Sequence, residues 1–155
     1  MKEEVSVIES EKGGARMSVR HFTAQDADWY QYGDRQIFVG DVLDSSNSEA
    51  ISVGFYRNRK KGARNEWVVT YDEALIVTKG ALTVRSAEGA ETAKAGEVIF
   101  LSKGTRVAYE AAEDDTEVVY VTYPHWMDAH RQSEHADLLD SYHPVQRAKA
   151  AGYED

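Results

Sequence analysis

One acidic residue, Glu73, stands within an apolar stretch that alternates like a β-strand. The neighbouring positions of the same parity hold large or apolar side chains, namely Trp67, Val69, Tyr71, Leu75 and Val77. Successive side chains of a strand point to opposite faces, so these residues share one side if no bulge intervenes. A carboxyl in such surroundings is desolvated, which raises its pKa and suits acid–base chemistry. We predict Glu73 as a general acid or base; the alternative is that it pairs with an Arg or Tyr hydroxyl and only orders the core.

Further candidates are residues that could orient a ligand beside Glu73. Tyr71 is the second predicted catalytic residue, because a phenol can orient a substrate next to the carboxyl. The predicted substrate-binding residues are Trp67, Glu66, Tyr109, Tyr123 and Val107. For each tyrosine, ordinary core packing is the alternative to ligand binding. Asp72 should point away from this set.

Two other groups of chemically capable residues receive plainer interpretations. The one basic cluster holds Arg57, Arg59, Lys60, Lys61 and Arg64, and we expect a solvated loop there rather than an anion clamp. Four of the five histidines fall near the end of the chain, at His125, His130, His135 and His143. A helix would place His130 and Glu134 on one face, but no His-Glu-x-x-His pattern accompanies them. We therefore predict a solvated or intersubunit helix rather than a metal site.

Composition excludes several function classes. The chain has 155 residues, a formal net charge of −9 and no cysteine. It therefore forms no disulfide, thiolate metal site or iron–sulfur cluster. The acidic balance argues against nucleic acid or an anionic membrane as a partner. No stretch reaches the roughly 18 apolar residues of a spanning helix, and the charged start is unlike a signal peptide. We expect a soluble, cytoplasmic protein of one domain.

The order of apolar runs and turn residues predicts an all-β fold. Around eight short runs rich in β-branched and aromatic residues follow one another between Val19 and Tyr123, which is typical of an antiparallel barrel or sandwich. One of them, Ile37-Phe38-Val39, is interpreted as ending at Gly40-Asp41. Met127 to Tyr142 has the spacing of one amphipathic helix anchored by Leu138 and Leu139. The predicted parts are an arm or edge strand at 1–18, a barrel at 19–126 and a helical tail at 127–155.

Two segments carry a resemblance to the cupin superfamily of small jelly-roll barrels. In the first, Glu73 and Gly80 stand where the first cupin motif has its glutamate and glycine. In the second, Gly96 and Gly104 match the two glycines of the other motif. The resemblance implies a single cupin-type jelly-roll β-barrel with a C-terminal helical appendage.

The usual metal ligands of cupins are replaced. The positions of the paired histidines hold Trp67 and Val69, or Glu66 and Val68 at the alternative spacing, and the last histidine position holds Val107. One carboxylate among such side chains cannot hold Fe, Mn, Ni or Zn with useful affinity. We predict no cofactor. A metal site built from Glu66, Glu73 and a tail histidine is the remaining alternative.

A narrower resemblance is to the EutQ proteins of ethanolamine utilization. It rests on Tyr-Asp-Glu at 71–73, on the 93–104 stretch and on the ending Tyr-Pro-x-Trp at 123–126. It implies a role around ethanolamine catabolism and its microcompartment, with acetate kinase activity proposed for the family; the chain has no Gly-rich phosphate loop. EutQ proteins carry an additional N-terminal region without a counterpart here.

We expect the barrel either to act on a small polar metabolite of the ethanolamine or acetyl type or to bind it as an accessory protein without turnover. The cupin resemblance further implies a homodimer.

Overall fold

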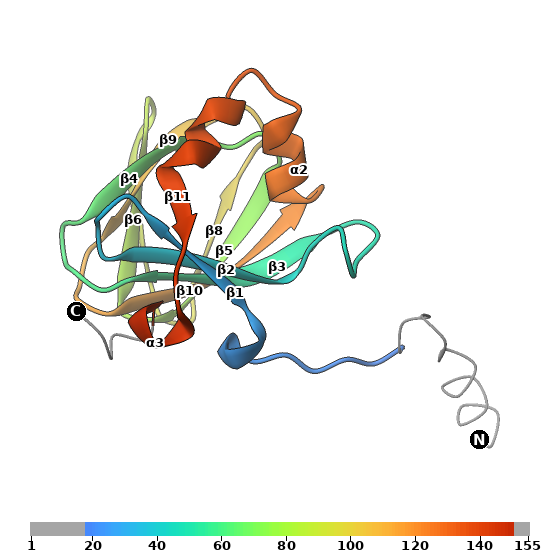
Figure 1. The fold of residues 1–155 in the computed structure, drawn as a ribbon. Coiled ribbons are helices and arrows are strands. Elements are labelled where there is room, and N and C mark those ends of the chain that lie inside the picture. The colour runs from blue at the N-terminus through green and yellow to red at the C-terminus, as the bar shows by residue number, and fades with distance from the viewer. Residues whose placement is uncertain (1–17, 151–155) are drawn as a thin grey trace, which may run out of the picture.

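Two antiparallel sheets pack face to face around the apolar core in this computed structural model, which describes residues 18–150 (Figure 1). The first sheet has the order β11-β1-β2-β3-β10-β5-β8, and the second has the order β4-β9-β6-β7. The strands of the two sheets are β1 Asp28–Tyr32, β2 Ile37–Leu43, β3 Ser52–Asn58, β4 Arg64–Val68, β5 Asp72–Lys79, β6 Ala81–Ser86, β7 Gly89–Lys94, β8 Val98–Leu101, β9 Arg106–Ala111, β10 Thr116–Tyr123 and β11 Tyr142–Pro144. The helical elements are η1 Ala24–Asp26, α2 Trp126–Arg131, η2 Ala136–Ser141 and α3 Arg147–Ala150. The predicted all-β jelly-roll fold is confirmed. The predicted arm at 1–18 lies outside the described residues except for its last position.

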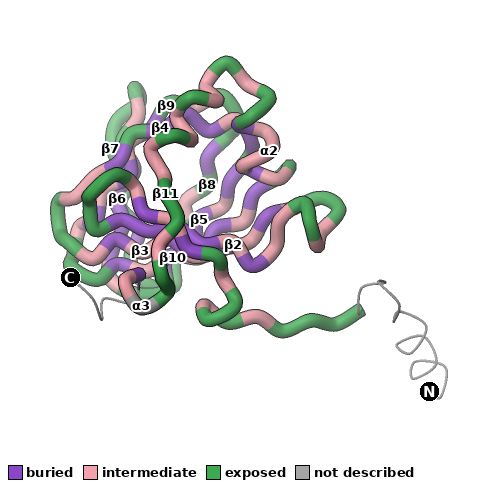
Figure 2. Tube along the Cα trace, in the orientation of Figure 1, coloured by how far each residue is buried: buried purple, intermediate pink, exposed green. Residues whose placement is uncertain are grey.

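Strand alternation decides which side chains enter the core. Along β5 buried and partly exposed residues alternate, and Glu73, Leu75 and Val77 are all buried (Figure 2). Trp67, Val69 and Tyr71 are buried as well, and all but Glu73 belong to one continuous hydrophobic core. The expectation that these six side chains share one side is therefore confirmed. Asp72 is exposed, as predicted, and accepts a hydrogen bond from the backbone of Lys103.

The interpretation of Gly40-Asp41 as the end of a strand is wrong. β2 continues to Leu43, and Gly40 and Asp41 pair with Phe55 and Gly54 of β3. Glycine is tolerated at position 40 because the indole of Trp29 lies against it, where a Cβ would come within 2.8 Å of a ring carbon. Asp41 consequently stands inside the sheet rather than in a turn.

The single helix predicted from Met127 to Tyr142 is also wrong. The segment forms α2, then η2, and finally β11, which pairs with β1 through Tyr30, Gln31 and Tyr32. A straight helix of that length would run about 24 Å in one direction. The observed path instead bends across the open end of the two sheets, and Leu138 and Leu139 both pack against the core, as predicted (Figure 1).

Within residues 18–150, no helix has the length and apolar content needed to cross a membrane. β8 forms one edge of the larger sheet and leaves Val98 and Phe100 exposed at 60% and 61%. The homodimer remains a prediction.

A backbone contact in the sheet gives a test of the packing. A Cβ at Gly54 would lie 2.5 Å from the carbonyl oxygen of Gly40 and would overlap the hydroxyl of Tyr120. Because the strands cannot separate without losing their ladder, Gly54→Ala should cost about 2 kcal/mol of unfolding free energy. Denaturant unfolding measures this cost. Val53→Ala, on the outer face of the same strand, should cost about 1 kcal/mol or less; equal costs for both variants would contradict the packing described here.

Candidate functional site: a buried carboxyl in an aromatic cavity

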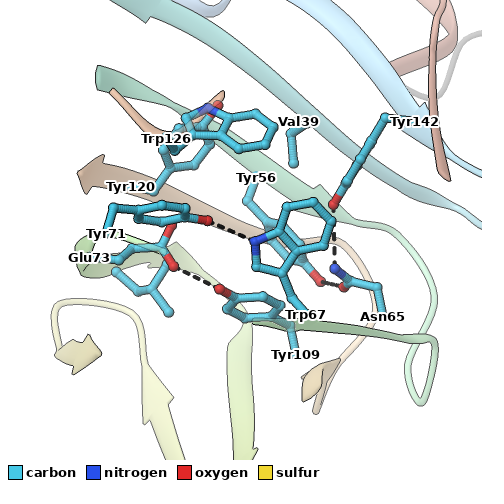
Figure 3. A pocket seen from close by; sticks show the side chains of 11 residues that line it. Val39, Tyr56, Asn65, Trp67, Tyr71, Glu73, Tyr109, Tyr120, Trp126 and Tyr142 are labelled. Atoms are coloured by element: carbon cyan, nitrogen blue, oxygen red, sulfur yellow. Dashed lines mark hydrogen bonds between the residues drawn. The ribbon is translucent and has the colours of Figure 1, made fainter. Parts of the chain in front are cut away.

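A small cavity lies between the two sheets, beneath the segment that crosses their open end. It holds about 40 Å³, room on the order of a few water molecules. Its lining consists mainly of aromatic side chains with one carboxyl and one amide: Val39, Tyr56, Asn65, Trp67, Tyr71, Glu73, Leu75, Tyr109, Tyr120, Trp126 and Tyr142 (Figure 3). None of these lining residues carries a positive charge.

Glu73 is the carboxyl of this cavity, and β5 places it there by alternation. Its side chain is buried, and one oxygen, Oε1, accepts a hydrogen bond of 2.7 Å from the Tyr109 hydroxyl (Figure 3). Burial raises the pKa of Glu73 from its usual 4.5 to about 7, although the bond from Tyr109 acts in the opposite direction. Glu73 therefore exchanges its proton near neutral pH, which is the property required of an acid–base group.

Tyr71 and Trp67 form a second polar contact inside the cavity. The indole N–H of Trp67 donates to the Tyr71 hydroxyl at 2.8 Å. Burial raises the pKa of Tyr71 well above its ordinary value, so the phenol keeps its proton. The Trp67 ring is held by His130, which stacks on it with ring centroids 4.3 Å apart. Both residues therefore present fixed groups to the cavity.

A third group of polar side chains lies on the opposite wall. The Tyr56 hydroxyl donates to the side-chain oxygen Oδ1 of Asn65 at 3.2 Å, and the side-chain nitrogen Nδ2 of Asn65 donates to the Tyr142 hydroxyl at 3.4 Å (Figure 3). Tyr142 thus acts as an acceptor in this contact, as Tyr71 does in its contact with Trp67. Among the residues that the structure describes, neither hydroxyl donates a hydrogen bond to a protein acceptor.

Asp41 is a site residue that the sequence analysis missed. Its carboxylate accepts hydrogen bonds from the Tyr120 hydroxyl and from the indole N–H of Trp126, the latter at 2.9 Å, and both donors line the cavity. Burial raises the pKa of Asp41 to about 6; the bonds from Tyr120 and Trp126 oppose that rise. The available signal was an aspartate inside a run of strand-forming residues, where aspartate is disfavoured unless its carboxylate has partners.

Three of the five predicted binding residues lie outside the cavity lining. Tyr109 lines the cavity as predicted, but Glu66 is exposed and Tyr123 is 62% exposed, because alternation turns both outward. Val107 is buried opposite Trp67 in the strand pair of β4 and β9, but it does not line the cavity. These three side chains therefore do not line the cavity beside Glu73.

The alternative metal site is not assembled. Glu66 is exposed while Glu73 is buried, so the two carboxylates of that alternative do not meet. Across residues 18–150, no three His, Cys, Asp or Glu side chains come together as a metal-binding group. The predicted pairing of His130 with Glu134 on one helix face is wrong, because α2 ends at Arg131; His130 contacts Thr70 instead.

The basic cluster is matched by acidic partners. Arg59 lies 3.5 Å from Asp115, and Arg64 lies 3.5 Å from Glu110. The backbone N–H of Lys61 donates to Asp114. None of the five basic residues lines the cavity. Arg59, Lys60 and Lys61 lie in the loop between β3 and β4, as expected, whereas Arg57 belongs to β3 and Arg64 to β4.

The chain has the fold of a cupin barrel. An RmlC-like cupin from Shewanella frigidimarina superimposes with a TM-score of 0.57, over 71% of this chain and 96% of that one, at 13% identity. Such low identity supports the fold alone. The site differs in kind from a metal-binding barrel, since aromatic residues surround its carboxyl.

The family can then be stated. The sequence model described as "Ethanolamine utilisation protein EutQ" matches residues 3–128, and this chain belongs to that family. The structure of the Clostridium difficile EutQ protein superimposes with a TM-score of 0.56 at 28% identity, covering 64% of this chain and 69% of that one. The protein named acetate kinase EutQ from Clostridioides difficile is 27% identical over 88 residues, 57% of this chain. The match spans 54% of that relative's length.

Because the pKa of Glu73 is raised, replacing its carboxyl should change the unfolding free energy in a pH-dependent way. A carboxyl whose pKa is higher in the folded state than in the unfolded state favours folding when protonated, so its contribution is lost as pH rises from about 4.5 to 7. At pH 8 the cost of the ionised group is about 3 kcal/mol. Glu73→Gln keeps the acceptor for Tyr109 and should therefore be more stable than the wild type at pH 8, with little difference at pH 4.5.

Chemical unfolding of both proteins across this pH range measures the difference. The matched control is Glu91→Gln on β7, where the carboxyl is exposed, and its effect on stability should be small. A Glu73→Gln variant that is equally destabilised at pH 4.5 and pH 8 would show that Glu73 is an ordinary structural carboxylate.

Proposed function

We propose that the cavity binds a small protonated amino alcohol, of which ethanolamine is the leading example, with its ammonium group against Glu73. The observation that carries this proposal is the buried carboxyl of Glu73, whose pKa is about 7. No other residue that lines the cavity is charged, so no cationic side chain compensates Glu73 there. An ammonium group beside Glu73 favours the ionised carboxylate and offsets its burial.

The aromatic lining supports a cation as the ligand. Trp67 and Trp126 approach with ring centroids 6.0 Å apart, and Tyr71 and Tyr142 lie edge-on to Trp126. Faces of such rings attract organic cations, and cages of this kind bind alkylammonium groups in other proteins. An anionic ligand meets the opposite situation here: it would lie beside a carboxylate without a Lys or Arg to compensate.

The hydrogen-bonding groups support an additional hydroxyl on the ligand. Glu73 accepts from Tyr109 through Oε1, which leaves Oε2 for the ammonium group. The protons of Tyr71 and Tyr142 need an acceptor, and a hydroxyl oxygen supplies one. The cavity of about 40 Å³ restricts the ligand to a few heavy atoms unless side chains move. A small amino alcohol satisfies charge, donors and size together.

The names of relatives agree in part with this chemistry. The family description refers to ethanolamine utilisation, and ethanolamine is an amino alcohol. The name acetate kinase belongs to a relative of which this chain matches about half, and phosphoryl transfer relies on cationic groups around the phosphate. The cavity offers none, so we assign it amine binding rather than kinase chemistry.

Turnover is the second candidate function. A carboxyl with a pKa near 7 can take a proton from, or give one to, a group on the bound ligand, with Tyr71 orienting that group. In this case the chain is an acid–base catalyst acting on the amino alcohol. Without turnover, the chain is a binding protein for the amino alcohol in ethanolamine utilisation. Product analysis after incubation with ethanolamine separates the two.

Calorimetric titration tests the proposed ligand. Ethanolamine should bind more tightly than ethylamine, which lacks the hydroxyl, and far more tightly than ethylene glycol or acetate, which lack the positive charge. Glu73→Gln should lower the affinity for ethanolamine at least tenfold, since it removes a buried charged partner. Tyr71→Phe should lower the affinity for ethanolamine towards that for ethylamine, and Glu91→Gln should bind ethanolamine with the affinity of the wild type.

The pH dependence has a defined sign. Alkylamines stay protonated throughout the range from pH 5 to 8, so affinity should follow the ionisation of Glu73 and fall by about tenfold per pH unit below 7. Acetate binding more tightly than the amines, or full ethanolamine affinity in Glu73→Gln, would refute the proposal.

A further inference from the structure

The open end of the two sheets is closed by the segment from residue 124 to residue 145, which we call the strap. It runs through α2 and η2 and ends by adding β11 to the larger sheet beside β1 (Figure 1). Two of its side chains, Trp126 and Tyr142, form part of the cavity wall (Figure 3). The match to the family model ends at residue 128, so most of the strap lies beyond it.

Trp126 is fastened to the body of the protein by Asp41. The indole N–H lies 2.9 Å from Oδ1 and 3.2 Å from Oδ2 of Asp41, and the Trp126 backbone N–H donates to the hydroxyl of Ser52. Asp41 also accepts from Tyr120, the neighbouring aromatic residue of the wall. One carboxylate on β2 therefore fixes two aromatic walls, of which one belongs to the strap.

Asp41 lies between the cavity and a separate surface cleft. The cleft holds about 190 Å³ and reaches Asp41 from outside, whereas Tyr120 and Trp126 separate Asp41 from the space beside Glu73. The carboxylate therefore faces polar surroundings on one side and the aromatic wall on the other. It cannot touch a ligand beside Glu73 while the wall is in place, so any effect that it has on binding passes through Trp126 or Tyr120.

We propose that Asp41 is a positioning residue, which holds Trp126 against the cavity and thereby sets the affinity for the ligand. This inference rests on the proposed function, because the affinity concerned is that for the amino alcohol. Hydrogen bonds to a carboxylate are about twice as strong as those between neutral groups, so protonation of Asp41 loosens both aromatic walls. Strap closure is then coupled to pH by a group distinct from Glu73.

Several charged groups surround Asp41, and the coupling depends on all of them. Burial is the main cause of its raised pKa of about 6, and the carboxylates of Asp44 and Asp28 add to it. The titratable and charged residues around the cleft are Asp28 and Tyr30 of β1, Asp44 after β2, and His125, Asp128 and Arg131 of the strap. Arg131 is paired with Asp128 at 3.0 Å, which reduces its pull on Asp41.

A double-mutant cycle tests whether Asp41 acts through Trp126. Asp41→Asn and Trp126→Phe should each lower ethanolamine affinity by about tenfold, and the double variant should fall no further than either alone. Asp28→Asn is the control, because it removes a charge from the same cleft without touching Trp126. Additive losses in the cycle, or an equal loss in Asp28→Asn, would show that Asp41 acts only by its charge and would overturn the assignment.

A spectroscopic measurement decides the inference without any ligand. The indole N–H signal of Trp126, identified by its absence in Trp126→Phe, should shift with an apparent pKa of about 6 in the wild type and stay constant in Asp41→Asn. A signal that does not titrate in the wild type, or that titrates equally in Asp41→Asn, would overturn the positioning role. Failure of the wild type to bind any amine would instead refute the proposed function.

Discussion

The burial of one carboxyl among aromatic side chains is the constraint on which the rest of this structure depends. Glu73 enters the core because β5 alternates, and it keeps a partner there because β9 places the Tyr109 hydroxyl 2.7 Å away. Burial among these side chains raises the pKa of Glu73 to about 7. An apolar residue at this position would give a purely structural core more stability, and this cost of the buried carboxyl is the reason why we propose a functional role for Glu73.

The strap completes this environment. Without Trp126 and Tyr142 the cavity would open towards solvent, and the carboxyl would lose the desolvation that defines it. Asp41 holds the strap from the side of β2, and it is a partly buried carboxylate with a raised pKa. Among the residues that the structure describes, two carboxyls thus have pKa values raised towards neutrality, of which one faces the cavity and the other secures its wall.

Much of the fold and the central residue of the site could be predicted from the sequence. Alternation around Glu73 and the paired cupin motifs were sufficient to predict the barrel fold and the burial of Glu73, because both signals reflect local strand geometry. The path of the strap was not predictable, since the spacing of its apolar residues suits a helix and only contact with the barrel end bends it into α2, η2 and β11. Asp41 was missed because Gly-Asp is a usual turn signal, whereas here Trp29 fills the space beside Gly40 and the strand continues. Glu66 and Tyr123 are exposed because strand alternation turns both outward, a rule that was applied to the residues around Glu73 but not to these two.

The central claim is that Glu73 titrates near neutral pH and becomes an ionised partner for an ammonium ligand. A carbon-13 NMR titration of the Glu73 carboxyl, assigned with Glu73→Gln, measures this directly. We expect an apparent pKa of about 7 for Glu73 in the free protein and a clear decrease when ethanolamine is added. A carboxyl that titrates near 4.5 in the free protein, or that is unaffected by saturating ethanolamine, would contradict it.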